Sequence, residues 1–150
     1  MKILISYATN SGGTYEAGLI IQDVLAQKHQ VDLKKALLTA PDDFNNYDLI
    51  IFGSPSWTFG DRDGFPHEDM LLFLNKLQGQ SYPAKKFAVY GCGDSSYAVF
   101  CGAVEKMEAT ISQLQGQKIV DSLKLDGYFF KQKDNEIRVA DFAKKILQLI

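Results

Sequence analysis

A run of hydroxyl, amide and glycine residues near the N-terminus directly precedes a segment with helical periodicity. It consists of Thr9, Asn10, Ser11, Gly12, Gly13 and Thr14. The first N–H groups of a helix have no partner inside the helix, and together with the helix dipole they favour a bound anion. The three hydroxyls would add donors, so the run indicates a phosphate site. An ordinary N-cap turn uses the same residue types and remains the alternative.

This run contains no lysine, which distinguishes it from loops that hold nucleoside triphosphates. Those loops follow the pattern G-x-x-x-x-G-K-[ST], and dinucleotide folds follow G-x-G-x-x-G. Neither pattern occurs at residues 9–14. A monophosphate held mainly by neutral donors is therefore the favoured ligand group.

Two later loops place aromatic side chains after strand-like segments. The loop expected at residues 54–66 contains Trp57, the only tryptophan, in its first part (residues 54–61), and the loop at residues 92–97 ends in Tyr97. A flat aromatic ligand could stack on such rings. Trp57 could instead fold onto the helices, Tyr97 could be a surface residue, and Asp94 could cap a helix. One phosphate loop combined with two aromatic loops predicts a site for a phosphorylated planar heterocycle.

The elements that must position these loops alternate along the chain. Strand-like segments cover residues 2–7, 30–35, 48–53, 86–91 and 117–125. Helical periodicity covers residues 13–28, the segment with Met70, Phe73, Leu74 and Leu77 on one face, residues 103–114 and residues 139–150. This alternation predicts an α/β fold with a doubly wound, five-stranded parallel sheet and helices on both faces. Ligands of such sheets bind beyond the carboxyl ends of the strands, where all three loops lie.

Composition narrows the possible classes of protein. The 150 residues contain no linker or repeat, which predicts a single domain over residues 1–150. A net charge of −2 argues against a nucleic-acid partner. Without an apolar run long enough for a bilayer or a signal peptide, we expect no membrane segment and a cytoplasmic location.

Four side chains with reactive potential lack a recognisable motif. Cys92 and Cys101 are nine residues apart, which suits neither a C-x-x-C motif nor a metal site, so we expect reduced thiols and no metal. His29 and His67 lie in predicted loops, where we expect them to be solvated and without partners.

The third loop and its continuation resemble one protein family. The residues Tyr90-Gly91-Cys92-Gly93-Asp94-Ser95-Ser96-Tyr97, continuing to Phe100-Cys101-Gly102-Ala103-Val104, are similar to the third flavin loop of short-chain flavodoxins. The likeness extends over essentially all 150 residues in the family's own order. It implies a flavodoxin-like sheet of strand order 2-1-3-4-5, and the uninterrupted strand at residues 117–125 is typical of the short-chain branch.

The resemblance also implies a cofactor, FMN, and a role for each loop. Residues 9–14 would hold the FMN phosphate, Trp57 would cover the inner face of the isoalloxazine ring and Tyr97 its outer face. Cys92, Gly93, Asp94 and Cys101 would line the ring edge. Pro55, Ser56, Thr58, Phe59, Gly60 and Phe100 complete the expected FMN contacts.

The function implied is that of a low-potential carrier of single electrons rather than an enzyme. Its partners would be reductase-type donors and acceptor redox proteins, with the chain acting as a monomer. Asp61, Asp63 and Asp94 would disfavour further negative charge on the flavin and dock basic patches of a partner. The alternative is a small FMN-dependent NAD(P)H quinone or flavin reductase of the same fold, in which hydride must approach a ring face that Tyr97 would cover.

Two positions depart from the pattern of the family. Gly13 stands where many members have Asn, so one side-chain donor to the phosphate is missing. Thr58 stands where many short-chain members have Gly, next to Trp57, and a rearrangement of its peptide would cost about 1 to 3 kcal/mol.

Overall fold

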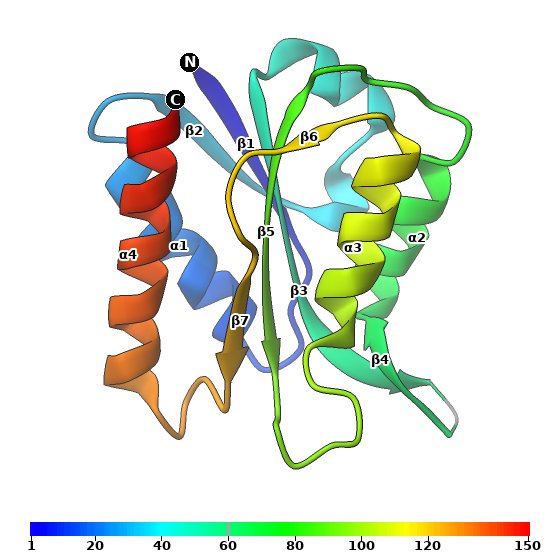
Figure 1. Cartoon of the computed structure of the whole chain (residues 1–150), viewed down its shortest axis with the longest axis vertical. Coiled ribbons are helices and arrows are strands. Elements are labelled where there is room, and N and C mark those ends of the chain that lie inside the picture. The colour runs from blue at the N-terminus through cyan, green and yellow to red at the C-terminus, as the bar shows by residue number, and fades with distance from the viewer. Residues whose placement is uncertain (60) are drawn as a thin grey trace.

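A parallel sheet forms the centre of the computed structural model, which describes residues 1–59 and 61–150 (Figure 1). Its strand order is β2-β1-β3-β5, followed by β6 and β7, which both pair with β5. The predicted order 2-1-3-4-5 is therefore confirmed, with β5 as the fourth strand and β6 and β7 together as the fifth. The strands are β1 (Lys2–Tyr7), β2 (Gln30–Lys35), β3 (Leu49–Phe59), β4 (Arg62–Pro66), β5 (Lys86–Gly93), β6 (Gln117–Lys118) and β7 (Leu123–Asp126).

Helices cover both faces of the sheet, as predicted. They are α1 (Gly13–Leu25), α2 (Glu68–Lys76), α3 (Gly102–Gln113) and α4 (Gln132–Leu149), with short 3-10 turns at Ala36–Leu38 and Pro41–Asn46. Figure 1 shows α1 and α4 together on one face and α2 and α3 on the other. Of the helices in the described ranges, none is both long and apolar enough to cross a membrane.

The two faces arise from the alternation of side chains along each buried strand. On β3, Leu49 and Ile51 pack under α1 and α4, whereas Ile50 and Phe52 pack under α2 and α3. Side chains of a strand point alternately to opposite faces, so a strand buried on both sides must be apolar throughout. This is the reason that continuous apolar runs identified the central strands.

The region between β3 and α2 differs from its prediction. Residues 54–66 are rich in glycine, proline and aspartate and were expected to form a loop, but they form a hairpin. The strand β3 continues to Phe59, and β4 turns back along it, with Trp57 opposite Phe65. The register shifts between Trp57 and Phe59, so the ladder between β3 and β4 is irregular near the end of β3.

The fifth strand is also not continuous. Lys86 pairs with Gln117, but Tyr90 pairs with Leu123, so four steps along β5 correspond to six steps along its partner. The two additional residues separate β6 from β7. Because Ile119 and Val120 in this gap are partly buried against the apolar cluster of α1 and α4, packing accounts for the interruption.

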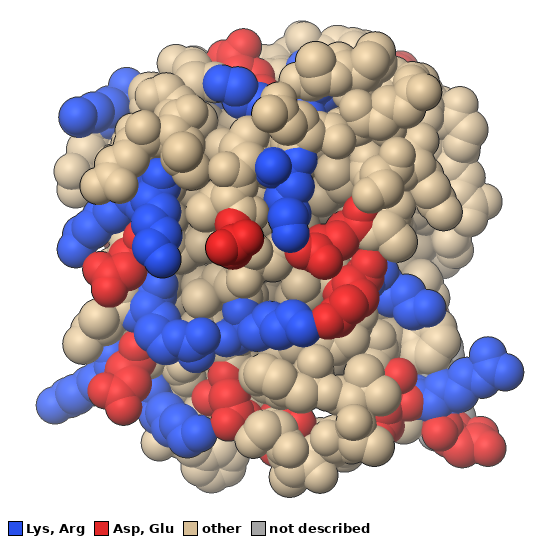
Figure 2. Space-filling view, in the orientation of Figure 1, with Lys and Arg blue, Asp and Glu red and all other residues tan. Residues whose placement is uncertain are grey.

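Charged side chains protect this outer edge of the sheet. Lys118 pairs with Glu108 at 2.5 Å, and Lys124 pairs with Glu105. Figure 2 shows basic and acidic side chains alternating across this face. Lysines on an edge strand disfavour pairing with the strand of another molecule.

A buried tyrosine connects the sheet to the start of α1. The Tyr90 hydroxyl donates a 3.0 Å hydrogen bond to the Thr14 carbonyl oxygen. Its ring lies so close to the backbone that a Cβ on Gly53 would be 2.2 Å from Tyr90 Cζ, and one on Gly18 2.8 Å from the hydroxyl oxygen. Burial raises the pKa of Tyr90 well above its ordinary value, so the hydroxyl remains a donor.

Replacing this tyrosine tests its role as an anchor. Tyr90→Phe keeps the ring but removes the donor to a buried carbonyl, and we expect the free energy of unfolding in urea to fall by about 1 kcal/mol. Tyr15→Phe, in which the parent side chain is 39% exposed, is the control and should change it by less than about 0.5 kcal/mol. Equal stability of Tyr90→Phe and the parent protein would contradict an anchoring role for the hydroxyl.

Candidate functional site

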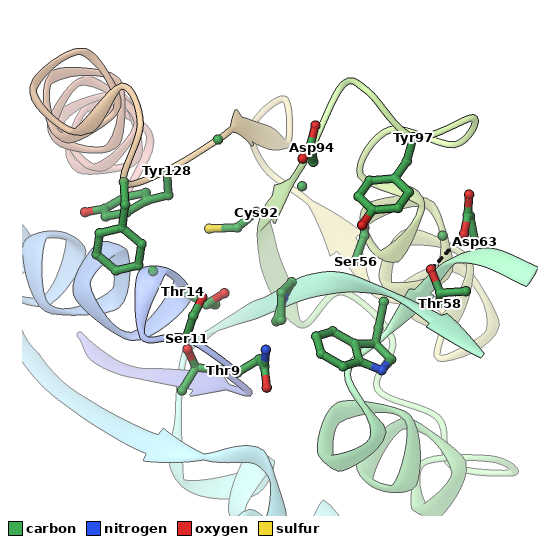
Figure 3. Close-up of a pocket in the computed structure, with 18 of the residues that line it drawn as sticks. Thr9, Ser11, Thr14, Ser56, Thr58, Asp63, Cys92, Asp94, Tyr97 and Tyr128 are labelled. Carbon is green, nitrogen blue, oxygen red and sulfur yellow. Dashed lines mark hydrogen bonds between the residues drawn. The ribbon is translucent and has the colours of Figure 1, made fainter. Parts of the chain in front are cut away.

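A cavity of about 470 Å³ opens at the carboxyl ends of the parallel strands. Four segments meet there: the run after β1, the hairpin after β3, the loop after β5 and the turn after β7. Figure 3 shows Thr9, Ser11 and Thr14 on one side of this cavity and Tyr97, Ser56 and Thr58 across from them. The predicted residues that line it are Thr9, Asn10, Ser11, Gly13, Thr14, Pro55, Ser56, Trp57, Thr58, Cys92, Gly93, Asp94 and Tyr97.

The run at residues 9–14, here called the anchor loop, has the properties of an anion site. Gly12 is the N-cap of α1 with a φ of 100°, a left-handed conformation that glycine adopts without strain, and no side chain caps the helix. The Gly12 N–H donates to Thr9 Oγ1 at 3.0 Å, which fixes the turn. The Thr14 hydroxyl is buried and makes no hydrogen bond of ordinary length within the described part of the chain. A buried donor without a partner is costly, so this loop fits a bound anion.

Gly13 lies in close contact with Tyr128, a residue near the other end of the chain. A Cβ at Gly13 would lie 3.2 Å from the Cβ of Tyr128, which is only 5% exposed. Figure 3 shows Tyr128 beside Thr14 at the start of α1. The departure from the family pattern at this position therefore has a structural reason: a larger residue at position 13 would make a tight contact with Tyr128.

The hairpin supplies the second wall of the cavity. Trp57, expected in a loop, lies on the extension of β3, and its side chain is 42% exposed. The Thr58 hydroxyl donates to Asp63 across the hairpin at 2.7 Å (Figure 3), and Ser56 Oγ accepts the Ala103 N–H of α3 at 3.0 Å. Backbone pairing and these bonds hold the wall to the rest of the fold.

The expectation that the two histidines lack partners is wrong, since His29 Nδ1 lies 3.4 Å from the N-terminal amine. His67 caps α2, because its Nδ1 accepts the Asp69 N–H at 3.1 Å, and its ring meets that of Trp57 edge-on at 6.2 Å. Histidine is not among the preferred N-cap residues, so sequence alone gave no signal for this role. The His67 ring thus packs against the indole of Trp57.

The loop after β5 is held by its own acidic residue and by the neighbouring strand. Asp94 Oδ1 accepts both the hydroxyl and the N–H of Ser96, and these bonds lower the pKa of Asp94. Asp126 pairs with Lys131 at 2.9 Å and accepts two hydrogen bonds from Ser95, which together lower the pKa of Asp126 to about 2. Tyr97 extends from this loop with 57% of its side chain exposed.

The two cysteines have different positions. Cys92 lines the cavity, and burial raises the pKa of its thiol to about 11, an effect partly offset by its weak interaction with Thr14. Cys101 is fully buried, and its Sγ points to the carbonyl oxygens of Gly91 and Leu125 at 3.9 and 3.8 Å. Both are therefore neutral thiols near pH 7.

Not every predicted contact residue reaches the cavity. Gly12 shapes the anchor loop from behind, Cys101 is the left-handed N-cap of α3, and Phe100 packs on the apolar cluster of α2 and α3. A Cβ at Gly93 would lie 2.7 Å from Cys101 Sγ, so Cys101 supports the cavity lining without being part of it. The predictions for Gly60 and for the Phe59 side chain lie outside the described residues.

Several lining residues were missed by the sequence analysis. They are Gly64, Val99, Gly127, Tyr128, Phe129 and Phe130, and Asp63, expected only as a nearby charge, also lines the cavity. The aromatic run at residues 128–130 was the available signal, because it follows the fifth strand at the same sheet edge as the other loops. Among the lining residues described, two are acidic and none is basic, so an anion in this cavity depends on neutral donors.

The amino-acid sequence is similar to those of known flavodoxins. The sequence model of the family described as flavodoxin matches residues 5–136. A flavodoxin of Maridesulfovibrio salexigens is 34% identical over 128 residues, which cover 84% of this chain and 86% of the relative.

Solved structures extend the likeness to the whole fold. Oxidised flavodoxin 2 of Bacillus cereus matches with a TM-score of 0.90 and 29% identity, over 100% of both chains. A Fusobacterium nucleatum flavodoxin bound to flavin mononucleotide matches with a TM-score of 0.83 over 98% of this chain and 97% of its own. At 18% identity, the second match concerns the fold alone.

Proposed function

The chain belongs to the flavodoxin family, and on that premise we propose that its cavity binds one FMN without a covalent link and that the protein carries single electrons. The observation that carries this proposal is the anchor loop, where the buried Thr14 hydroxyl and the uncapped start of α1 lie in the same cavity as Trp57 and Tyr97. Members of this family are electron-transfer proteins rather than enzymes. No catalytic side chain is therefore required.

The phosphate would be held by the anchor loop. The hydroxyls of Thr9, Ser11 and Thr14 and the first N–H groups of α1 are the donors available there. Hydrogen bonds to a charged group are stronger than those between neutral groups, so neutral donors can hold the anion. This arrangement supports the expectation, from the absence of lysine, that the ligand carries a single phosphate.

The aromatic side chains would hold the ring. Trp57 and Tyr97 both line the cavity and keep large exposed surfaces, 42% and 57%, that a planar ligand could cover. FMN supplies the redox chemistry when bound, and the chain tunes it. Asp63 and Asp94, with no basic residue among the described lining, raise the energy of any added negative charge, which supports a low potential.

We take residues 1–150 as one binding unit that acts as a monomer in the cytoplasm. Cys92 and Cys101 are unpaired, in keeping with a reducing compartment. The redox partners of such a carrier would be reductase-type donors and acceptor proteins. An enzyme that takes hydride from a nicotinamide is the rival assignment, and no described residue favours it.

A reductive titration tests the proposed function. We expect purified protein to be yellow, or its apoprotein to become so with FMN, and to accept electrons in two separate steps during anaerobic reduction followed by visible absorbance. NADPH alone should leave the spectrum unchanged. A colourless protein that does not bind added FMN would refute the proposal, and rapid bleaching by NADPH would favour the reductase.

Substitution of the indole tests the stacking role. Trp57→Ala removes one aromatic surface and should raise the dissociation constant for FMN about tenfold, measured by quenching of flavin fluorescence. Trp57→Phe retains an aromatic face and serves as the matched control, with a smaller increase. If Trp57→Ala leaves both the affinity and the lower reduction potential unchanged, Trp57 does not contact the ring.

Salt dependence tests the docking of redox partners. If Asp61, Asp63 and Asp94 attract a basic surface, the rate of electron transfer from a reductase should fall as ionic strength rises. Asp63→Asn should flatten this dependence, whereas Asp42→Asn, on the 3-10 turn between β2 and β3, should not. A rate that does not respond to salt in the parent protein would exclude electrostatic docking at this rim.

A further inference from the structure

We propose that Phe129 covers the phosphate end of the cavity and strengthens the hold of the anchor loop on the ligand's phosphate. This rests on the proposed function, because it assigns a role to one more residue of the same site. Phe129 belongs to the turn after β7, here called the aromatic turn (residues 127–130), far from the anchor loop in sequence. Apart from its run of three aromatic residues, nothing in the sequence assigns this turn to the site.

The ring of Phe129 stands against the N-cap of α1. Its Cζ atom lies 3.9 Å from the position that a Cβ would take on Gly12. It meets the ring of Tyr128 edge-on, with centroids 5.2 Å apart and an interplanar angle of 86°. Tyr128 is itself buried against Gly13, so one side of Phe129 rests on a fixed support while 44% of the residue stays exposed.

The aromatic turn is held in place by hydrogen bonds that need no ligand. The Gly127 N–H donates to the Gly93 carbonyl at 2.9 Å, and the Phe130 N–H closes the turn on the Gly127 carbonyl at 2.9 Å. The buried Asn135 side chain donates to the Asp126 and Tyr128 carbonyls at 3.0 and 3.3 Å. Phe129 is therefore positioned before any ligand arrives, and binding need not order it.

Charge explains why a cover would matter at this end. The described lining offers a phosphate no basic side chain, only N–H and O–H donors. Such hydrogen bonds weaken in contact with water and strengthen where water is excluded. An apolar ring beside Gly12 excludes water at the start of α1, where the unpaired N–H groups of the helix are. The Phe129 ring thus strengthens binding of the phosphate and not of the isoalloxazine.

Phe130 provides a matched comparison within the same turn. It is 95% exposed and extends into solvent at the border of the cavity. Removing its ring changes the apolar character of the turn by the same amount, without removing the contact at the N-cap of α1. A role of Phe129 as a cover predicts that the two substitutions differ.

The experiment compares two ligands that differ only in the phosphate. The apoprotein is titrated with FMN and with riboflavin, and the ratio of the two dissociation constants measures what the phosphate contributes. In Phe129→Ala we expect the FMN constant to rise about tenfold and the riboflavin constant to change by less than about twofold. Phe129→Leu should retain most of the FMN affinity, and Phe130→Ala should match the parent protein for both ligands.

Three results would overturn the role of Phe129 while leaving the proposed function intact. They are an unchanged ratio in Phe129→Ala, an equal loss of affinity for both flavins, and an equal effect of Phe130→Ala. Failure of the parent apoprotein to bind FMN at all would instead end the proposed function, and this inference with it. Thermal unfolding of each variant separates a loss of the cover from a loss of the fold.

Discussion

The contact between Tyr90 and the start of α1 is the constraint on which the site depends. The phenol lies on Gly53 of the adjacent strand and against Gly18 of the helix, and either position would clash with it if it carried a side chain. Its hydroxyl bonds the Thr14 carbonyl, one residue from the glycine pair of the anchor loop. These contacts fix the distance between the sheet and the start of α1, which is where the hydrogen-bond donors for an anion are exposed. Protein interiors are packed as densely as organic crystals, so such a contact leaves little freedom for α1 to move relative to the sheet.

The other walls of the cavity are held in the same manner, by bonds internal to the protein. Asp63 bonds Thr58 across the hairpin, Asp94 bonds Ser96 within its loop, and Asp126 bonds Ser95 from the neighbouring strand. Each of these acidic residues stands at the carboxyl edge of the sheet and stabilises a segment that lines the cavity. The negative charge near the cavity is thus also the means by which its loops are shaped. The same carboxylates set the charge near the cavity and stabilise its loops, so substituting one of them would affect both the charge and the loop structure.

Sequence periodicity was sufficient for the main elements and for the anchor loop. Apolar runs buried on both faces identified β1, β3 and β5, and the helical spacing of residues 139–150 identified α4, because these patterns follow from the geometry of one element. The helix begins earlier than predicted, at Gln132, because its first two turns are mostly polar and carry no apolar periodicity. The hairpin of β3 and β4 was missed because its residues are typical of loops and its pairing depends on the tertiary position of Trp57 and Phe65. The interruption between β6 and β7 was missed for a similar reason, since a register shift leaves no periodic trace.

The site residues divide in the same way. Most of those in the three predicted loops line the cavity, because loops after parallel strands share one edge of the sheet. Gly12 is the exception among those that the structure describes in full. Phe100 and Cys101 follow the third loop but do not line the cavity: Phe100 packs on the apolar cluster of α2 and α3, and Cys101, in a left-handed conformation, is the N-cap of α3. The positions of Tyr128 and Phe129 in the cavity lining were not predicted, because they depend on tertiary contacts with the glycines of the anchor loop.

The packing of Tyr128 on Gly13 couples two positions that are far apart in the sequence. A side chain at position 13 would bring its Cβ to 3.2 Å from the Cβ of Tyr128, so the aromatic turn would have to move by a few tenths of an ångström to accommodate it. A designer who adds a side-chain donor at position 13 should therefore expect its effect to depend on the packing of residue 128, so substitutions at the two positions should not be additive.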